Sequence, residues 1–206
     1  MARKTKDEAE KTKERILESA LDLFVEKGYE KTTFTEIAAR LQLTKGAVYW
    51  HFESKEQLLV ALVDELLEKF EKGLIANRPL DALDFAAASE MMACVAEKVV
   101  SNAKDRAFFL LLKTQVRWGE ETMRETRERL MTNDRVSPFH AFVTAVENGK
   151  RDGTVRGDAD STEVAHIAIS MWDGLVQSKI DGFLRTDLKT TLLHGFAAVF
   201  GSIRKN

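Results

Sequence analysis

Residues 33–58, TFTEIAARLQLTKGAVYWHFESKEQL, contain three helix starts in close succession. Thr33 is followed by Glu36 at the third helical position, the capping-box pattern that satisfies free amides at a helix N-terminus. Thr44 can cap a second, short helix, and Ser54 opens a third with the same capping pattern. Two short helices joined by a turn of a few residues are typical of a helix-turn-helix, whose second helix enters the DNA major groove.

A set of residues at fixed spacing within this stretch carries a family resemblance. These residues are Ile37-Ala38, Leu43-Thr44-Lys45-Gly46, Tyr49-Trp50-His51-Phe52 and Lys55. They resemble the DNA-binding signature of the tetracycline-repressor (TetR) family over about residues 11–60, and the remainder resembles the family in length and helical pattern. The family usually has glycine in the turn, where this chain has Gln42. Because a Cβ strains the left-handed backbone that glycine adopts, we expect this turn to be built slightly differently.

The composition indicates an all-α protein with a sizeable core. The chain has 206 residues, 44% of them hydrophobic, and only two prolines. No run alternates apolar and polar residues as a strand does, and no apolar run approaches the roughly 20 residues that span a bilayer. Residues 1–6 lack the apolar core of a signal peptide, and the single Cys94 excludes an internal disulfide. We therefore expect a cytoplasmic protein with no membrane association.

Charge contributes little to the prediction of DNA binding. The net charge is −2, with 11 Lys or Arg against 10 Asp or Glu in residues 1–55 and 20 against 23 in residues 56–206. A nucleic-acid-binding domain recognised by charge is usually far more basic. The prediction therefore rests on the helix-turn-helix pattern. The charged residues near the N-terminus favour a solvated, mobile terminus over an arm that follows a DNA groove.

Hydrophobic periodicity predicts two helical domains that share one helix. A first helix over residues 10–27 presents an apolar stripe and ends at Gly28, which closes a three-helix head, residues 1–55. The fourth helix runs to about residue 74 and connects the head to a larger ligand-binding and dimerisation domain, residues 56–206. In that domain we expect helices over residues 80–101, 104–118, 120–132, 137–151, 163–182 and 188–203.

The recognition helix carries the predicted contacts to DNA. Thr44, Lys45 and Ala47 would face base edges, since lysine donates to guanine and a methyl group contacts thymine. Gly46 would let the backbone approach the DNA closely. The predicted phosphate contacts are Thr33, Tyr49, His51 and Lys55. The resemblance implies that Thr33, Tyr49 and Lys55 bind the DNA backbone, because they match positions that do so in the family.

The aromatic residues after Tyr49 are divided between core and surface. Trp50 and Phe52 are predicted to lie in the core of the head. For His51, packing and a phosphate contact are equally compatible with the sequence. The alternative for the whole recognition helix is that its polar residues only cap and solvate a structural helix, and the complete motif favours DNA binding.

The larger domain is rich in aromatic residues and methionine, which suit a cavity for a variable apolar ligand. The family resemblance implies a small-molecule effector bound in this domain. An aromatic stripe at helical spacing is more commonly ordinary core, and that alternative stays open for each residue. The predicted lining residues are Met91, Phe108, Phe109, Gln115, Trp118, Phe139, Phe142, Met171 and Trp172.

The last two expected helices present a second apolar surface. Two such helices from each of two subunits would form a four-helix bundle, as the resemblance implies, and an intrachain helix pair is the alternative. A dimer suits DNA recognition, because one short helix reads too few base pairs to be selective. The predicted dimerisation residues are Trp172, Leu175, Val176, Leu192, Phe196, Val199, Phe200 and Ile203.

Together these features predict a homodimeric, sequence-specific transcriptional regulator without cofactor or metal. We expect a repressor that binds a pseudo-palindromic operator in double-stranded DNA and is released by a small, largely apolar ligand. The alternatives are a ligand-independent DNA-binding dimer and an all-α enzyme or interaction module. Catalysis has little support, because Glu163 and His166 share a helical face without a third metal ligand, and a nucleophile motif is lacking.

Overall fold

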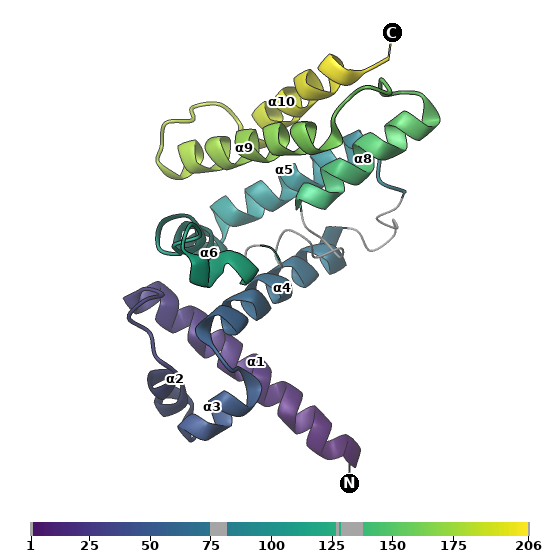
Figure 1. Cartoon of the computed structure of the whole chain (residues 1–206). Coiled ribbons are helices and arrows are strands. Elements are labelled where there is room, and N and C mark those ends of the chain that lie inside the picture. The colour runs from purple at the N-terminus through teal and green to yellow at the C-terminus, as the bar shows by residue number, and fades with distance from the viewer. Residues whose placement is uncertain (1, 75–81, 127, 129–137, 206) are drawn as a thin grey trace. The chain divides into compact units, whose positions relative to one another are not determined.

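The computed structural model of the chain is α-helical (Figure 1) and describes residues 2–74, 82–126, 128 and 138–205. Within this part of the chain, extended pairing is limited to one bridge between Val155 and Arg204, so the all-α prediction is confirmed. None of the described helices is long and apolar enough to cross a membrane. The elements are, in chain order, α1 (Ala2–Lys27), α2 (Phe34–Leu41), α3 (Lys45–His51), α4 (Lys55–Leu74), α5 (Phe85–Ser101), α6 (Ala103–Thr114), the 3-10 helix η2 (Glu121–Met123), α8 (Pro138–Asp152), α9 (Ser161–Ile180) and α10 (Leu188–Ile203).

Three predicted helix boundaries differ from the observed ones by four residues or more. Helix α1 begins at Ala2, so the terminus that we expected to be mobile is helical. Helix α5 begins only at Phe85, because the Asp84 carboxylate caps it by accepting a hydrogen bond from the Ala87 amide (2.6 Å). Helix α6 ends at Thr114, four residues before the expected end. The helix expected over residues 120–132 lies partly outside the described residues.

The helices form two compact units, and each unit is made of two separate segments of the chain. Unit 1 comprises Met1–Leu66 and Ala107–Leu130, and unit 2 comprises Leu67–Arg106 and Met131–Asn206. Helix α4 contributes to both units, as the sequence predicts for a shared helix, and α6 is divided in the same way. These units are defined differently from the predicted domains, so the predicted boundary at residue 55 stays a prediction.

The core of unit 1 is built on the apolar stripe of α1. Ile16, Ala20 and Phe24 are fully buried in one cluster with residues of α2, α3 and α4. The stripe works because residues three and four apart share a helix face. Buried residues of the second segment complete the cluster, namely Phe108, Leu111, Val116 and Met123.

Two residues in the left-handed conformation end helices in unit 1. Gly28 follows α1 with φ +94°, and Gln42 follows α2 with φ 57° and ψ 37°. The expectation of a differently built turn at Gln42 is therefore wrong. Gln42 adopts the left-handed conformation despite its Cβ, at a cost of roughly 1–2 kcal/mol, and its amide donates to the Ala39 carbonyl (3.2 Å).

In unit 2, helix α9 packs against α8 and α10, and α5 packs against all three (Figure 1). Phe142 and Phe196 are fully buried with ring centroids 5.1 Å apart. The buried Trp172 indole donates from Nε1 to the Met92 carbonyl (2.7 Å), which ties α9 to α5. Buried aromatic side chains with satisfied polar atoms make this a well-packed core.

Candidate DNA interface and ligand cavity

The predicted helix caps are present and position the two short helices. Thr33 Oγ1 accepts from the Glu36 amide (3.3 Å), and Glu36 Oε2 accepts from the Thr33 amide (3.0 Å), which confirms the capping box. Thr44 Oγ1 accepts from the Ala47 amide (3.1 Å) and begins α3. Since each cap satisfies an amide that would otherwise lack a partner, the sequence itself sets where α2 and α3 begin.

Helix α3 turns one face to the core and the other to solvent. Val48 is fully buried, whereas Tyr49 is 47% exposed and Trp50 is 73% exposed. The Lys45 ammonium lies 5.3 Å from the Tyr49 ring centroid, so a positive charge and a phenol share the exposed face. Of the other residues predicted to meet base edges, the structure exposes Thr44 and Gly46 and half-buries Ala47.

The assignment of Trp50 to the core is wrong, whereas that of Phe52 is confirmed. Phe52 is buried and belongs to the core of unit 1. Trp50 is two residues from the inward-facing Val48, and two residues are about 200° around a helix, so its side chain points outward. Its ring meets the His51 ring edge to face, with centroids 4.6 Å apart. Trp50 therefore belongs to the exposed surface of α3.

His51 is half-buried beside this surface. Burial lowers the pKa of its imidazole below 6.5; the Glu10 carboxylate raises that pKa, and the Lys13 ammonium lowers it. The ring is therefore mainly neutral at pH 7 in the free protein. A neutral imidazole still has one N–H donor for a phosphate oxygen but adds no charge.

Lys55 connects the start of α4 to the end of α1. Its Nζ donates to the carbonyl oxygens of Tyr29 (3.0 Å) and Glu30 (3.1 Å), and it lies 4.7 Å from the Tyr29 ring centroid. An ammonium has three N–H donors, so one donor is left for a phosphate. Lys55 therefore has a structural role in unit 1, and its contact with a phosphate stays a prediction.

Gln115 holds the same corner of unit 1. Its Oε1 accepts a hydrogen bond from the Tyr29 amide (3.2 Å). The same oxygen lies 2.9 Å from the position that a Cβ on Gly28 would occupy. The backbone turn after α1 is therefore formed around this one side-chain oxygen, which the sequence pattern did not reveal.

The predicted ligand-lining residues are divided between the two units, and their contact with a ligand stays a prediction. Phe108 and Trp118 pack in the core of unit 1, Phe109 belongs to the same segment, and Gln115 serves the turn at Tyr29. In unit 2, Trp172 ties α9 to α5, and a Cβ at Gly195 would collide with Met171 Sδ. The remaining predicted residues also lie in unit 2, with Met91 and Phe142 buried and Phe139 half-buried.

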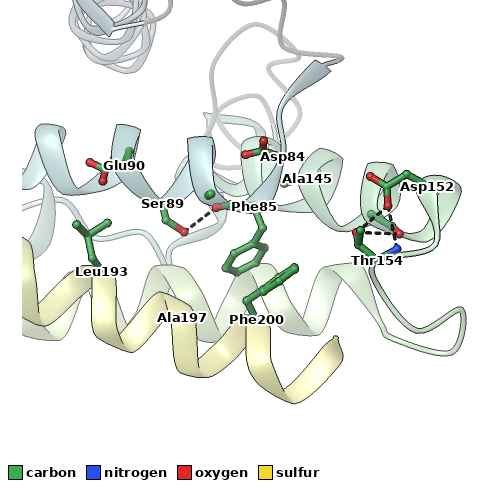
Figure 2. Close-up of a pocket in the computed structure, with 12 residues that line it drawn as sticks. Asp84, Phe85, Ser89, Glu90, Ala145, Asp152, Thr154, Leu193, Ala197 and Phe200 are labelled. Atoms are coloured by element: carbon green, nitrogen blue, oxygen red, sulfur yellow. Dashed lines mark hydrogen bonds between the residues drawn. The ribbon is translucent and has the colours of Figure 1, made fainter. Parts of the chain in front are cut away.

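Unit 2 contains a cavity of about 510 Å³ between α5, α8 and α10 (Figure 2). None of the predicted ligand-lining residues lines it. Its apolar wall includes Phe85 and Phe200, whose ring centroids are 5.2 Å apart, and its rim carries the carboxylates of Asp84, Glu90 and Asp152. This volume is within the range of about 300–1,000 Å³ typical of small-molecule sites.

Five of the eight predicted dimerisation residues are buried within the single chain: Trp172, Val176, Leu192, Phe196 and Ile203. Leu175 and Val199 are half-buried, and Phe200 lines the cavity. The apolar rows of α9 and α10 therefore contribute to the intrachain core, and contact of the predicted residues with a second subunit stays a prediction. The exposed faces of the two helices carry different residues, namely Ile167, Ser170, Gly174, His194, Ala198 and Gly201.

Within the described residues, no three His, Cys, Asp or Glu side chains are grouped closely enough to hold a metal ion. Glu163 and His166 are both exposed on α9. The candidate functional sites are therefore the exposed helix-turn-helix surface in unit 1 and the cavity in unit 2.

The family described as "Bacterial regulatory proteins, tetR family" matches residues 16–62. The HTH-type transcriptional regulator TtgR of Pseudomonas putida is 30% identical over 179 residues, which are 86% of this chain and 84% of the relative. The probable acrEF/envCD operon repressor of Escherichia coli is 27% identical over 193 residues, 91% of this chain and 84% of the relative.

Two solved structures share the fold. The SmeT–triclosan complex superposes with a TM-score of 0.72 at 23% identity, over 95% of this chain and 92% of that chain. Native NalD, the secondary repressor of the MexAB-OprM multidrug efflux pump in Pseudomonas aeruginosa, has a TM-score of 0.70 at 23% identity, over 97% and 98%. Because the similarity to TtgR spans most of both chains and the signature residues form the exposed helix α3, the chain belongs to the TetR family of DNA-binding transcriptional regulators.

Proposed function

We propose that the chain is a homodimeric repressor that binds a pseudo-palindromic operator and releases it when a small molecule binds in unit 2. The observation that carries the proposal is the exposed face of α3, with Lys45, Tyr49 and Trp50 directed to solvent. The names of the relatives support repression, since one is a probable acrEF/envCD operon repressor and NalD represses a multidrug efflux pump. An efflux operon is therefore the proposed target.

The N-terminal half of α3 would read bases in the major groove. Lys45 would donate to guanine, and the methyl groups of Thr44 and Ala47 would contact thymine. A Cβ at Gly46 would lie 3.9 Å from Thr44 Oγ1, so packing within the chain does not require glycine there. Close approach of the backbone to DNA is the proposed reason for this glycine.

The phosphate contacts would flank this base-reading surface. Tyr49, His51 and Trp50 can each donate one hydrogen bond from the exposed edge of α3. Thr33 and Lys55 would act from the starts of α2 and α4, where free backbone amides also favour anions. Phosphate contacts hold the protein in register, and the few base contacts then supply selectivity.

A second copy of the chain would cover the exposed faces of α9 and α10. Gly174 and Gly201 have open space where a Cβ would be, and Ile167, two helical turns before Gly174 on α9, is 48% exposed. Small residues allow close helix approach, and covering an exposed isoleucine is favourable. Two copies would present their α3 helices to half-sites about one helical turn, roughly 34 Å, apart.

Effector binding would be coupled to DNA through the helices that contribute to both units. A ligand that binds the DNA-releasing arrangement about a hundredfold better supplies roughly 2.7 kcal/mol of coupling. The SmeT structure holds triclosan, which supports a small organic effector. The cavity in unit 2 favours this proposal over a dimer that binds DNA without a ligand.

Fluorescence anisotropy on DNA from the upstream region of the chain's own gene, compared with scrambled DNA over a salt series, tests the proposal. We expect preference for the upstream DNA and a steep fall of affinity with salt. Tyr49→Ala should weaken binding to both DNAs, whereas Lys45→Ala should also lose about 1–3 kcal/mol of base discrimination. Arg185→Ala, an exposed cation of unit 2, is the control for lost charge. Unchanged binding by both α3 variants would exclude α3 as the DNA-reading helix.

A further inference from the structure

We propose that Gln115 is a positioning residue for DNA binding: it fixes the turn after α1, and the fixed turn orders the Lys55 ammonium for a phosphate. Both residues belong to unit 1, Gln115 in the segment after α6 and Lys55 at the start of α4. The inference rests on the proposed function, because it assumes that Lys55 contacts a phosphate. It does not depend on which operator is bound or on an effector.

Tyr29 joins three segments of unit 1 through its main chain and its side chain. Its amide donates to Gln115 Oε1 (3.2 Å), and its carbonyl accepts from Lys55 Nζ (3.0 Å). Its hydroxyl donates to Glu56 Oε1 (3.4 Å). The ring is buried and meets the Phe24 ring edge to face, with centroids 5.1 Å apart. The end of α1, the start of α4 and the segment after α6 therefore meet at one residue.

The glycine before Tyr29 makes this turn depend on Gln115. Gly28 has φ +94°, and a glycine exchanges this conformation for others at little cost. Gln115 Oε1 lies 2.9 Å from the position of a Cβ on Gly28, so the amide group of Gln115 occupies the space that a side chain would fill. Because peptide groups are rigid planes, rotation at Gly28 would also displace the carbonyls of Tyr29 and Glu30, to which Lys55 donates.

Lys55 is held in one place before any DNA is bound. Its two hydrogen bonds to main-chain carbonyls, of 3.0 and 3.1 Å, and the Tyr29 ring 4.7 Å from its Nζ restrict a side chain that otherwise has many rotamers. Ordering a long side chain on binding weakens affinity, and here the ordering takes place on folding. The third N–H donor is left for a phosphate, at a helix start whose free amides also favour an anion.

Gln115→Met tests the proposal, because methionine has a similar length but no amide oxygen to accept from the Tyr29 amide. Fluorescence anisotropy of the full chain on the upstream duplex and on the scrambled duplex, over about 50 to 200 mM salt, measures the affinity and its salt dependence. We expect Gln115→Met to weaken binding to both duplexes about two- to tenfold, the effect of ordering one long side chain on binding.

A double-mutant cycle with Lys55→Met separates positioning from a general loss of stability. Lys55→Met should make the slope of log affinity against log salt shallower by about 0.9 per subunit, as for the loss of one phosphate contact. In that background Gln115→Met should have no further effect, since the side chain that it orders is gone. Equal weakening by Gln115→Met in both backgrounds, or an unchanged salt slope in Lys55→Met, would overturn the proposal.

The adjacent exposed residue Thr114 provides the matched controls. Thr114→Met should bind DNA like the wild type. Gln115→Glu retains an oxygen for the Tyr29 amide, so it should bind as tightly as Thr114→Glu, which adds the same charge.

Weaker binding by Gln115→Glu than by Thr114→Glu would contradict the role of the hydrogen bond. Equal binding of the wild type to both duplexes, with the coupling to Lys55 retained, would refute the repressor proposal and leave the role of Gln115 standing. A wild type that binds neither duplex would overturn both.

Discussion

The turn after α1 allows a quantitative test of how the DNA-binding unit is held together. Gly28 has φ +94°, a conformation that costs an alanine roughly 1–2 kcal/mol. A Cβ there would lie 2.9 Å from Gln115 Oε1 and would displace it from the Tyr29 amide. Losing that hydrogen bond costs about 1 kcal/mol. We therefore expect Gly28→Ala to lower the free energy of unfolding by roughly 2–3 kcal/mol, measured by urea denaturation.

A double-mutant cycle with Gln115→Ala separates the two contributions. Without Gln115 only the backbone strain remains, so Gly28→Ala should then cost roughly 1–2 kcal/mol, a coupling of about 1 kcal/mol. Gly153, with φ +83° and open space around a Cβ, is the matched site for strain alone. Additive effects of Gly28→Ala and Gln115→Ala would refute the reasoning, as would a cost no larger than that of Gly153→Ala.

Three further predictions concern other positions. Gln42→Gly should raise the free energy of unfolding by up to about 1 kcal/mol. Glycine relieves the backbone strain at φ 57°, and the greater entropy of its unfolded chain cancels part of this gain. A less stable variant would contradict this prediction. Burial and the Glu56 carboxylate raise the pKa of Tyr29. In the Tyr49→Phe variant, Tyr29 is the one tyrosine that is left to titrate. In that variant, ultraviolet titration should show no phenolate at pH about 10, the unfolded value, and stability should fall as pH rises above it; ionisation at the unfolded pKa would show that Tyr29 is not enclosed. Gly174→Arg should give a folded monomer by circular dichroism and ultracentrifugation, and an intact dimer would place the interface elsewhere.

The local features of the DNA-binding unit were predictable from the sequence. Thr33, Glu36 and Thr44 cap α2 and α3 as expected, because capping pairs are separated by only three residues. Gly28 ends α1 for the same local reason. Once the start of α3 is known, the position of each signature residue along that helix follows from the sequence. The prediction for the turn at Gln42 fails because its cost of about 1–2 kcal/mol is small beside the packing of α2 and α3.

The faces of the helices are less predictable. Periodicity favours a dimer interface for the apolar rows of α9 and α10, yet Leu192 and Phe196 are fully buried within one chain. Periodicity identifies an apolar face but does not identify the surface that covers it. The same limit explains why the core prediction for Trp50, which is close to the buried Val48, is wrong.

By itself, the sequence determined that the chain is helical, where its short helices begin, and which signature it carries, because these properties depend on residues one to four positions apart. The tertiary structure alone decided that Gln115 supports Tyr29 across 86 residues, and that Phe85 and Phe200 meet at one cavity. Such contacts join segments whose separation along the chain is much longer than a helical period. Their formation depends on how whole helices pack, and no local pattern records that packing.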